Sequence, residues 1–136
     1  MNDQLELAVS PDKVCFLIGK AREFHAKEDV VIPEEPMGSA EDWARQVLAD
    51  HRDDPSYQEL HELIDGMDVE EQVNLVALMW LGRGDFSTAE WSEALKEASE
   101  RLSAHTADYI IATPLVADYL EEGLSALGYT CEGITE

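Results

Sequence analysis

The first run of apolar residues at helical spacing begins just after residue 10. Ser10 supplies a hydroxyl for an N-cap, and Pro11 suits the first position of a helix. Apolar side chains then follow every three or four residues at Val14, Leu17, Ile18, Ala21 and Phe24. This spacing predicts a helix over residues 11–27.

Two more helices are expected before residue 66. Ser39 can cap a helix over residues 40–52, and Pro55 can open another over 55–65, with Gly66 at its end. Between the first two helices, residues 28–38 contain two prolines that follow a β-branched run. This composition predicts an extended, proline-containing connector that lies on the core, with a mobile flap as the alternative, and not a separate domain.

The most apolar segment is residues 69–81. Asp68 and Glu71 form a capping-box pattern at its start, and apolar side chains then occupy nearly every face of the helix. These positions include Val69, Val73, Leu75, Val76, Ala77, Leu78, Met79, Trp80 and Leu81. Because a helix that is apolar all round has to be buried, we expect this one at the centre of a bundle.

Helix-ending and helix-starting signals follow at once. Gly82 and Gly84 are expected to supply left-handed backbone that ends the central helix. The pattern Ser87-x-x-Glu90 predicts a capping box for a helix over 88–103. Phe86 and Trp91 are spaced to form a hydrophobic staple across that start.

Two more helices are expected in the last third of the chain. A short helix is expected around Tyr109 and Ile111, and Thr113-Pro114 can open a final helix that Gly128 stops. In this helix the inward positions are expected to be Leu115, Val116, Tyr119, Leu120, Leu124 and Leu127. We therefore predict an all-α fold: a compact bundle of six or seven helices around the helix at 69–81, in one domain over residues 1–136 with loose ends at 1–9 and 130–136.

The charge is strongly unbalanced, with 30 acidic against 9 basic residues and a formal net charge of −21. Because nucleic-acid binding depends on basic groups that neutralise phosphates, this balance argues against nucleic acid as a partner. It argues equally against anionic membrane surfaces. Solvated helix faces, salt adaptation, a basic protein partner and mimicry of a nucleic-acid backbone all fit the acidity.

Cysteine content and hydropathy bear on the compartment. Cys15 and Cys131 are too few for a disulfide framework, so free thiols are the expected state, with a single Cys15–Cys131 bridge as the alternative. No apolar run approaches the length of a membrane span, and the first residues do not resemble a secretory signal. Together these features predict a cytoplasmic protein.

No sequence pattern points to catalysis. His25, His51, His61 and His105 lie on different expected helices, and His61-Glu62 lacks the second histidine of a zinc-protease helix. The chain has no Gly-x-Ser-x-Gly elbow and no phosphate-cradling glycine loop. We therefore predict no catalytic residues, no metal site and no cofactor, and favour a non-enzymatic protein.

One candidate interaction patch remains at the end of the central helix: Trp80, Arg83, Asp85 and Trp91. Aromatic rings and a guanidinium are the side chains that most often dominate protein interfaces. The alternative is that both tryptophans belong to the core and that Arg83 pairs with Asp85 or another acid.

The stretch from Asp68 to Glu90, with WLGRGD at its centre, and ADYLEEGL near the end resemble a bacterial family labelled domain of unknown function 3775. The resemblance extends from about Leu7 to Tyr129. It implies a compact helical fold and a bacterial cytosolic origin, and it brings no catalytic or binding residues with it.

Three hypotheses for function follow. The first is a non-catalytic module that binds a protein partner, possibly a basic one, or a second copy of itself. The second is a small-molecule-binding protein or enzyme with a pocket between helices near Trp80 and Arg83. The third is a nucleic-acid mimic.

Overall fold

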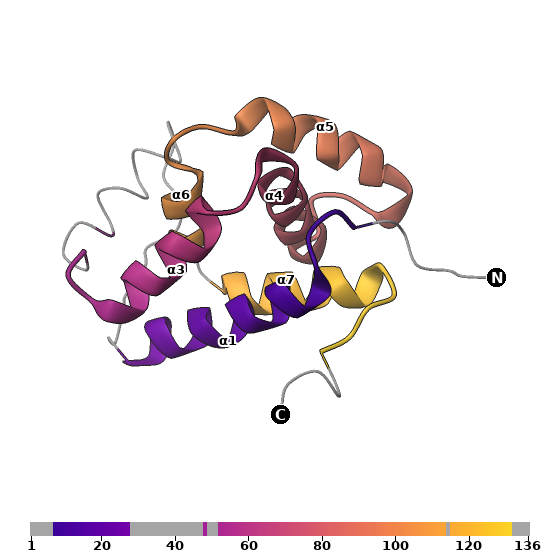
Figure 1. The fold of residues 1–136 in the computed structure, drawn as a ribbon. Helices are drawn as coiled ribbons and strands as arrows, with labels where there is room; N and C mark the ends of the chain where they lie inside the picture. The colour runs from indigo at the N-terminus through magenta and orange to yellow at the C-terminus, as the bar shows by residue number, and fades with distance from the viewer. Residues whose placement is uncertain (1–6, 28–47, 49–51, 114, 132–136) are drawn as a thin grey trace.

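The computed structural model describes residues 7–27, 48, 52–113 and 115–131 (Figure 1). These residues form six α-helices and a short 3₁₀ turn, and no strand occurs within these ranges. The elements are α1 (Pro11–Lys27), α3 (Pro55–Asp65), α4 (Val69–Arg83), η2 (Thr88–Glu90), α5 (Trp91–Arg101), α6 (Thr106–Ala112) and α7 (Val116–Ala126). The prediction of an all-α bundle is confirmed.

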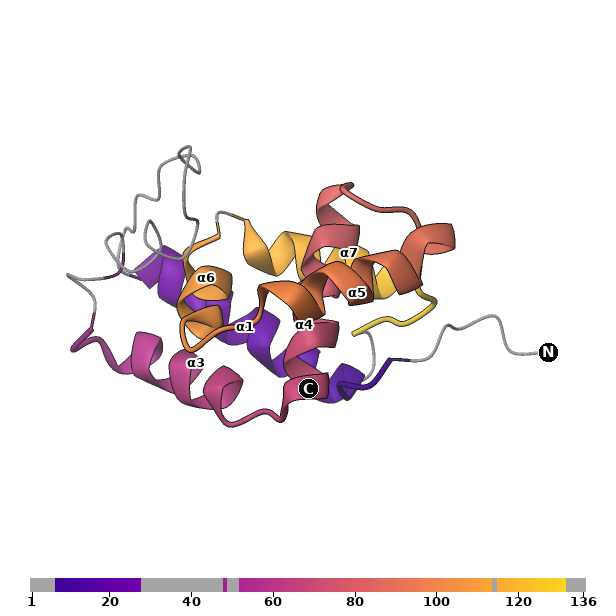
Figure 2. The same ribbon diagram turned by 90° about the horizontal axis from the view of Figure 1, so that it is seen from above.

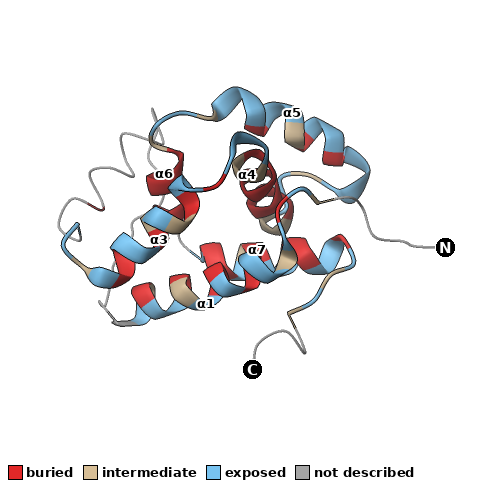
Figure 3. Ribbon diagram, in the orientation of Figure 1, coloured by how far each residue is buried: buried red, intermediate tan, exposed pale blue. Residues whose placement is uncertain are grey.

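Helix α4 lies at the centre of this bundle. In Figure 1 it is viewed almost along its axis, with α5 above it and α1 and α7 below it. It packs mainly against α7 and α5. Every residue from Val73 to Leu81 is buried, and the ribbon of α4 is mostly red in Figure 3. Val69 is the exception among the expected core positions, since it is 69% exposed in the first turn, before the helix enters the bundle.

The remaining helices form a layer around α4. Helix α1 packs against both α7 and α3, and α3 in turn packs against α6 (Figure 2). Their inward side chains include some of the largest fully buried ones, such as Phe24, Leu60, Ile110 and Leu120. The expected boundaries of the helices at 11–27 and 55–65 agree with the structure.

Local capping explains where several helices begin. The Ser10 hydroxyl accepts a hydrogen bond from the Asp12 backbone nitrogen at 3.1 Å. Asp68 and Glu71 form both hydrogen bonds of the expected capping box. The pattern at Ser87 starts the 3₁₀ turn η2, and the α-helix expected from residue 88 begins only at Trp91.

The glycine stops expected at Gly66 and Gly82 have different outcomes. Gly66 follows α3 directly, as expected, with right-handed backbone at φ −80°, whereas the stop expected at Gly82 is wrong. Gly82 lies inside α4, where a Cβ atom would overlap the carbonyl oxygen of Tyr119 on α7 and come within 2.9 Å of the Gly123 nitrogen. Gly82 therefore allows α4 and α7 to approach closely, and only Gly84, at φ 96°, supplies the left-handed end of α4.

The final helix begins later than expected. Leu115 has left-handed backbone at φ 61° just before α7 and is 59% exposed, so its prediction as a core residue is wrong. Tyr119 is only partly buried. The predicted stop at Gly128 is confirmed by its φ of 96°.

Two predicted segments cannot be compared in full. The helix over 40–52 and the connector over 28–38 lie outside the described residues, apart from Leu48 and Arg52. Leu48 is completely buried, as its place in the predicted apolar stripe requires.

A disulfide bond joins Cys15 on α1 to Cys131, so the expectation of free thiols is wrong. The Cα atoms lie 5.7 Å apart, although the residues are separated by 116 positions in the sequence. The tertiary fold brings them together, and local sequence carries no sign of that. Free thiols therefore no longer support the cytoplasmic location predicted from the sequence.

Parts of both expected loose ends are held against the core. Val9 is completely buried, and the Ala8 nitrogen donates to the Asn74 side-chain oxygen at 3.1 Å. At the other end, Cys131 is fixed by its bond to Cys15. Residues 7–9 and 130–131 are therefore not loose.

Among the described helices, none combines the length and the apolar character that crossing a membrane would need.

Candidate functional site

Trp80 lies near the end of α4 and is 5% exposed. Its indole nitrogen donates a hydrogen bond to the hydroxyl of Tyr109 on α6 at 3.0 Å. The Phe86 ring lies 5.9 Å from the Trp80 ring, centroid to centroid. The indole plane is therefore fixed from two sides by residues of different elements.

The loop after α4 turns back over Trp80 because of Gly84. The backbone nitrogens of Gly84 and Asp85 both donate to the Trp80 carbonyl oxygen, at 3.1 and 3.0 Å. These bonds need the left-handed backbone that Gly84 supplies. The reversal brings Phe86 onto Trp80, where the sequence pattern had suggested a staple with Trp91.

Arg83 and Asp85 form an ion pair at the edge of the same site. The Nε and Nη2 atoms of Arg83 donate to one carboxylate oxygen of Asp85, at 2.9 and 2.7 Å. Burial lowers the pKa of Arg83, but the hydrogen bonds that Arg83 donates to Asp85, together with the interaction with Tyr109, outweigh this effect and raise the pKa overall. Arg83 is thus a permanent cation whose charge is largely met by Asp85.

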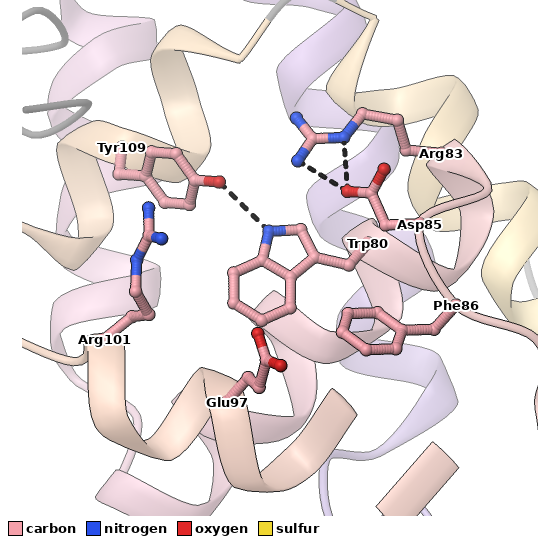
Figure 4. A pocket seen from close by; sticks show the side chains of 7 residues that line it. All are labelled: Trp80, Arg83, Asp85, Phe86, Glu97, Arg101 and Tyr109. Atoms are coloured by element: carbon pink, nitrogen blue, oxygen red, sulfur yellow. Dashed lines mark hydrogen bonds and ion pairs between the residues drawn. The ribbon is translucent and has the colours of Figure 1, made fainter. Parts of the chain in front are cut away.

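Helix α5 supplies the opposite wall. The Arg101 guanidinium carbon lies over the Trp80 ring, 5.8 Å from its centroid. Glu97, one turn earlier on α5, lines the same space. In Figure 4 Arg101 lies to the left of the indole and Glu97 below it, while Arg83 lies above it and Phe86 to its lower right.

These side chains enclose an open pocket of about 340 Å³, which we call the Trp80 pocket. It is lined by Trp80, Arg83, Asp85, Phe86, Glu97, Arg101 and Tyr109. Its exposed wall is mostly polar, although a buried indole lies at its base.

The structure thus brings together three of the four residues of the predicted interaction patch: Trp80, Arg83 and Asp85. Trp91 is 7% exposed and is not among the residues that line the pocket. Its indole nitrogen has no hydrogen-bond partner within the described part of the chain. Trp91 packs in the core at the start of α5.

A second polar cluster lies between α3 and α6, around Asp108. This carboxylate is 4% exposed and accepts a hydrogen bond from the Tyr57 hydroxyl at 2.6 Å. Arg52 lies 3.6 Å from its other oxygen, and His61 lies 3.9 Å away. Burial and the hydrogen bond to Asp108 raise the pKa of Tyr57 far above its usual value, so Tyr57 remains a proton donor.

Asp108 was not among the candidate residues predicted from the sequence. The available signal was the short helix Thr106–Ala112, in which Asp108 is the only charged residue and all residues are buried. A lone acid in such a segment needs partners, since an unpaired buried charge is costly.

His25 on α1 is a partly buried histidine at the border of the core. Its Nε2 atom lies 3.0 Å from the Ile111 carbonyl oxygen. Burial lowers the pKa of His25 and outweighs the opposing effect of this hydrogen bond. Across the described residues, no group of three or more potential ligands is arranged to hold a metal ion.

The family model described as "Protein of unknown function (DUF3775)" matches residues 57–129, just over half of the chain. The chain belongs to this family. The DUF3775 match begins at Tyr57 and is therefore shorter than the expected resemblance from Leu7. It includes every residue of the Trp80 pocket and leaves α1 outside.

No curated protein and no solved structure matches the chain.

Proposed function

We propose that this DUF3775 protein is a non-catalytic binding module for another protein, and that a side chain of the partner enters the Trp80 pocket. The observation that carries the proposal is the pocket itself, in which an immobilised indole is flanked by two arginines at the surface. Tryptophan, tyrosine and arginine are the residues that most often dominate binding energy at protein interfaces.

The size of the pocket fits this use. A volume of about 340 Å³ is at the small end of the range for complete small-molecule sites, roughly 300–1,000 Å³. It is large enough for one anchoring side chain. A contact of this kind needs surrounding surface on the partner to complete the interface.

The net charge of −21 supports a partner with basic surface around that anchor. Complementary charge speeds association and favours correct partners, and exposed charges are screened beyond about 8 Å at physiological ionic strength. Binding should therefore weaken as salt increases.

The test is an affinity pull-down from an extract of the source organism at low salt, with the retained proteins identified by mass spectrometry. Glu97→Trp fills the mouth of the pocket from an exposed position on α5. Glu100→Trp makes the same change of charge and size on the same helix, outside the residues that line the pocket.

We expect one partner to be retained by the unmodified chain and by Glu100→Trp, and to be lost with Glu97→Trp and with rising salt. Retention of the same partner by Glu97→Trp would show that the pocket is not the binding site. The absence of any specific partner at low salt would contradict the protein-binding role. If the partner is a second copy of this chain, sedimentation should show a dimer that Glu97→Trp abolishes.

A small-molecule-binding role is the second candidate, because the volume of the pocket still lies within the range for ligand sites. A ligand that raises the melting temperature of the unmodified chain, but not that of Glu97→Trp, would support it. A broad thermal-shift screen without such a ligand would count against it.

A further inference from the structure

Arg101 differs from the other cations of this acidic protein. Among the described lysine and arginine side chains, it alone has no carboxylate partner. The others form ion pairs as follows: Lys13 with Glu71, Lys20 with Glu23 and Glu59, Arg22 with Asp118 and Glu121, Arg52 with Asp108, Arg83 with Asp85, and Lys96 with Glu100. With 30 acidic residues in the chain, an arginine that is held over an indole and not by an acid is unusual.

The position over Trp80 orients Arg101 for binding. A guanidinium that lies over an aromatic face is held by the ring while its N–H donors remain available at its edge. Because Tyr109 fixes the indole, the ring offers Arg101 a stationary support. A planar fork of donors matches the two oxygens of a carboxylate.

We infer that the Trp80 pocket binds a single carboxylate, with the Arg101 guanidinium as the group that recognises it. The inference rests on the proposed binding role of the pocket and names the chemistry of what enters it. Arg83 contributes little net charge, since Asp85 already accepts two of its hydrogen bonds. Arg101 is therefore the cation that remains for a ligand.

The surrounding charges limit the ligand to one negative charge. Glu97 lines the same pocket one turn before Arg101, without being ion-paired to it in the described structure. A second anionic group would face this carboxylate as well as the overall charge of −21. A monocarboxylate is thus favoured over a phosphate dianion, and Glu97 can accept a hydrogen bond from an N–H group beside the carboxylate.

Such a carboxylate can come from a small acid, from the end of a chain or from an acidic side chain of a protein partner. The first experiment tests whether the pocket recognises a carboxylate, whatever molecule carries it. The probes are 3-phenylpropionate, its neutral amide 3-phenylpropionamide, the cation phenethylamine and inorganic phosphate. Binding is followed by NMR at the Trp80 indole N–H and the Arg101 Nε–H.

We expect 3-phenylpropionate to shift both resonances saturably and to bind at least tenfold more tightly than the other three probes. Arg101→Gln should weaken this binding at least tenfold. Arg101→Lys should weaken the binding of 3-phenylpropionate similarly, because lysine lacks the planar fork of donors, although it keeps the positive charge at the end of α5. Lys96→Gln, an equal change of charge on the same helix outside the pocket, should bind as the unmodified chain does.

Equal binding of the acid and the amide would overturn the inference, as would tighter binding of phosphate or the amine, or an unchanged affinity in Arg101→Gln. Three pentapeptides identify the source of the carboxylate. The first is amidated and has an internal glutamate, which tests an acidic side chain. The second is amidated and lacks the glutamate, and the third is the second peptide with a free C-terminus, which tests the end of a chain. Binding of only the small acid would assign the carboxylate to a metabolite.

The two proposals fail in different ways. If Glu97→Trp loses a partner while 3-phenylpropionate and its amide bind equally, the pocket is a protein-binding site but does not recognise a carboxylate. If 3-phenylpropionate binds through Arg101 but no partner is retained in the pull-down, the carboxylate site stands and the protein-binding role fails.

Discussion

At the scale of single residues, Asp108 shows how a buried charge is kept within this fold. The carboxylate is 4% exposed, and an unpaired charge at that depth would destabilise the fold. Tyr57 donates to it, and Arg52 and His61 lie near it from the α3 side. The cluster thus links α3 to α6, the helix that also carries Tyr109.

Replacing Tyr57 with phenylalanine tests this linkage. The change removes the hydroxyl donor and leaves the rest of the ring in place, so we expect a loss of about 1–3 kcal/mol in the free energy of unfolding. Urea denaturation measures it. Tyr119→Phe is the control, since Tyr119 is partly buried and its hydroxyl forms no hydrogen bond within the described structure. Equal stability of the two variants would contradict the role of Tyr57.

The residues of the Trp80 pocket separate into those that sequence could predict and those that it could not. Trp80, Arg83 and Asp85 are close in sequence, so helix and turn rules suffice to place them together. Tyr109 and Arg101 come from other helices. Their positions depend on how α5 packs against α4 and how α6 packs against α3 and α7, and no local pattern specifies that packing.

At the scale of elements, the contact between α4 and α7 depends on two glycines. A Cβ atom at Gly82 would overlap the Tyr119 carbonyl oxygen, and one at Gly123 would overlap the Leu78 carbonyl oxygen. At these two glycines the backbone of each helix therefore comes close to the backbone of the other. Periodicity predicted both helices, but it assigned Gly82 to the helix end because a glycine near a boundary has the same local signature in either role.

Replacing Gly82 with alanine should therefore destabilise the protein. We expect a loss of about 1–3 kcal/mol or more, because the added methyl group forces α4 and α7 apart. Gly19→Ala on α1 is the matched control, since a Cβ atom there meets nothing within 4 Å. It should stabilise the protein by up to about 1 kcal/mol, because alanine favours helix over glycine. Chemical denaturation of both variants gives the comparison, and a neutral Gly82→Ala would contradict the close approach.

The disulfide ties the C-terminal segment of the protein to α1. It closes a loop that spans 116 positions, and this loop contains α3 to α7. A bridge across so long a loop restricts the unfolded chain strongly. Two cysteines alone could not predict it, because their proximity follows from the packing of α1 against α7.

Removal of this bridge should lower stability by about 2–4 kcal/mol. Cys131→Ser should show a lower melting temperature than the oxidised chain, and a reducing agent should lower the melting temperature of the unmodified chain but not that of the variant. A melting temperature that neither change affects would show that the bridge does not constrain the unfolded chain.

The fold and the Trp80 pocket both depend on α4 being the buried centre of the molecule. Native-state hydrogen exchange measures this directly, because amides in the most stable part of a protein exchange only when the whole chain unfolds. We expect the amides from Val73 to Leu81 to be among the slowest, with opening free energies close to that of global unfolding. Exchange of these amides as fast as those of α5, which buries only Trp91, Ala94 and Ala98, would contradict the account.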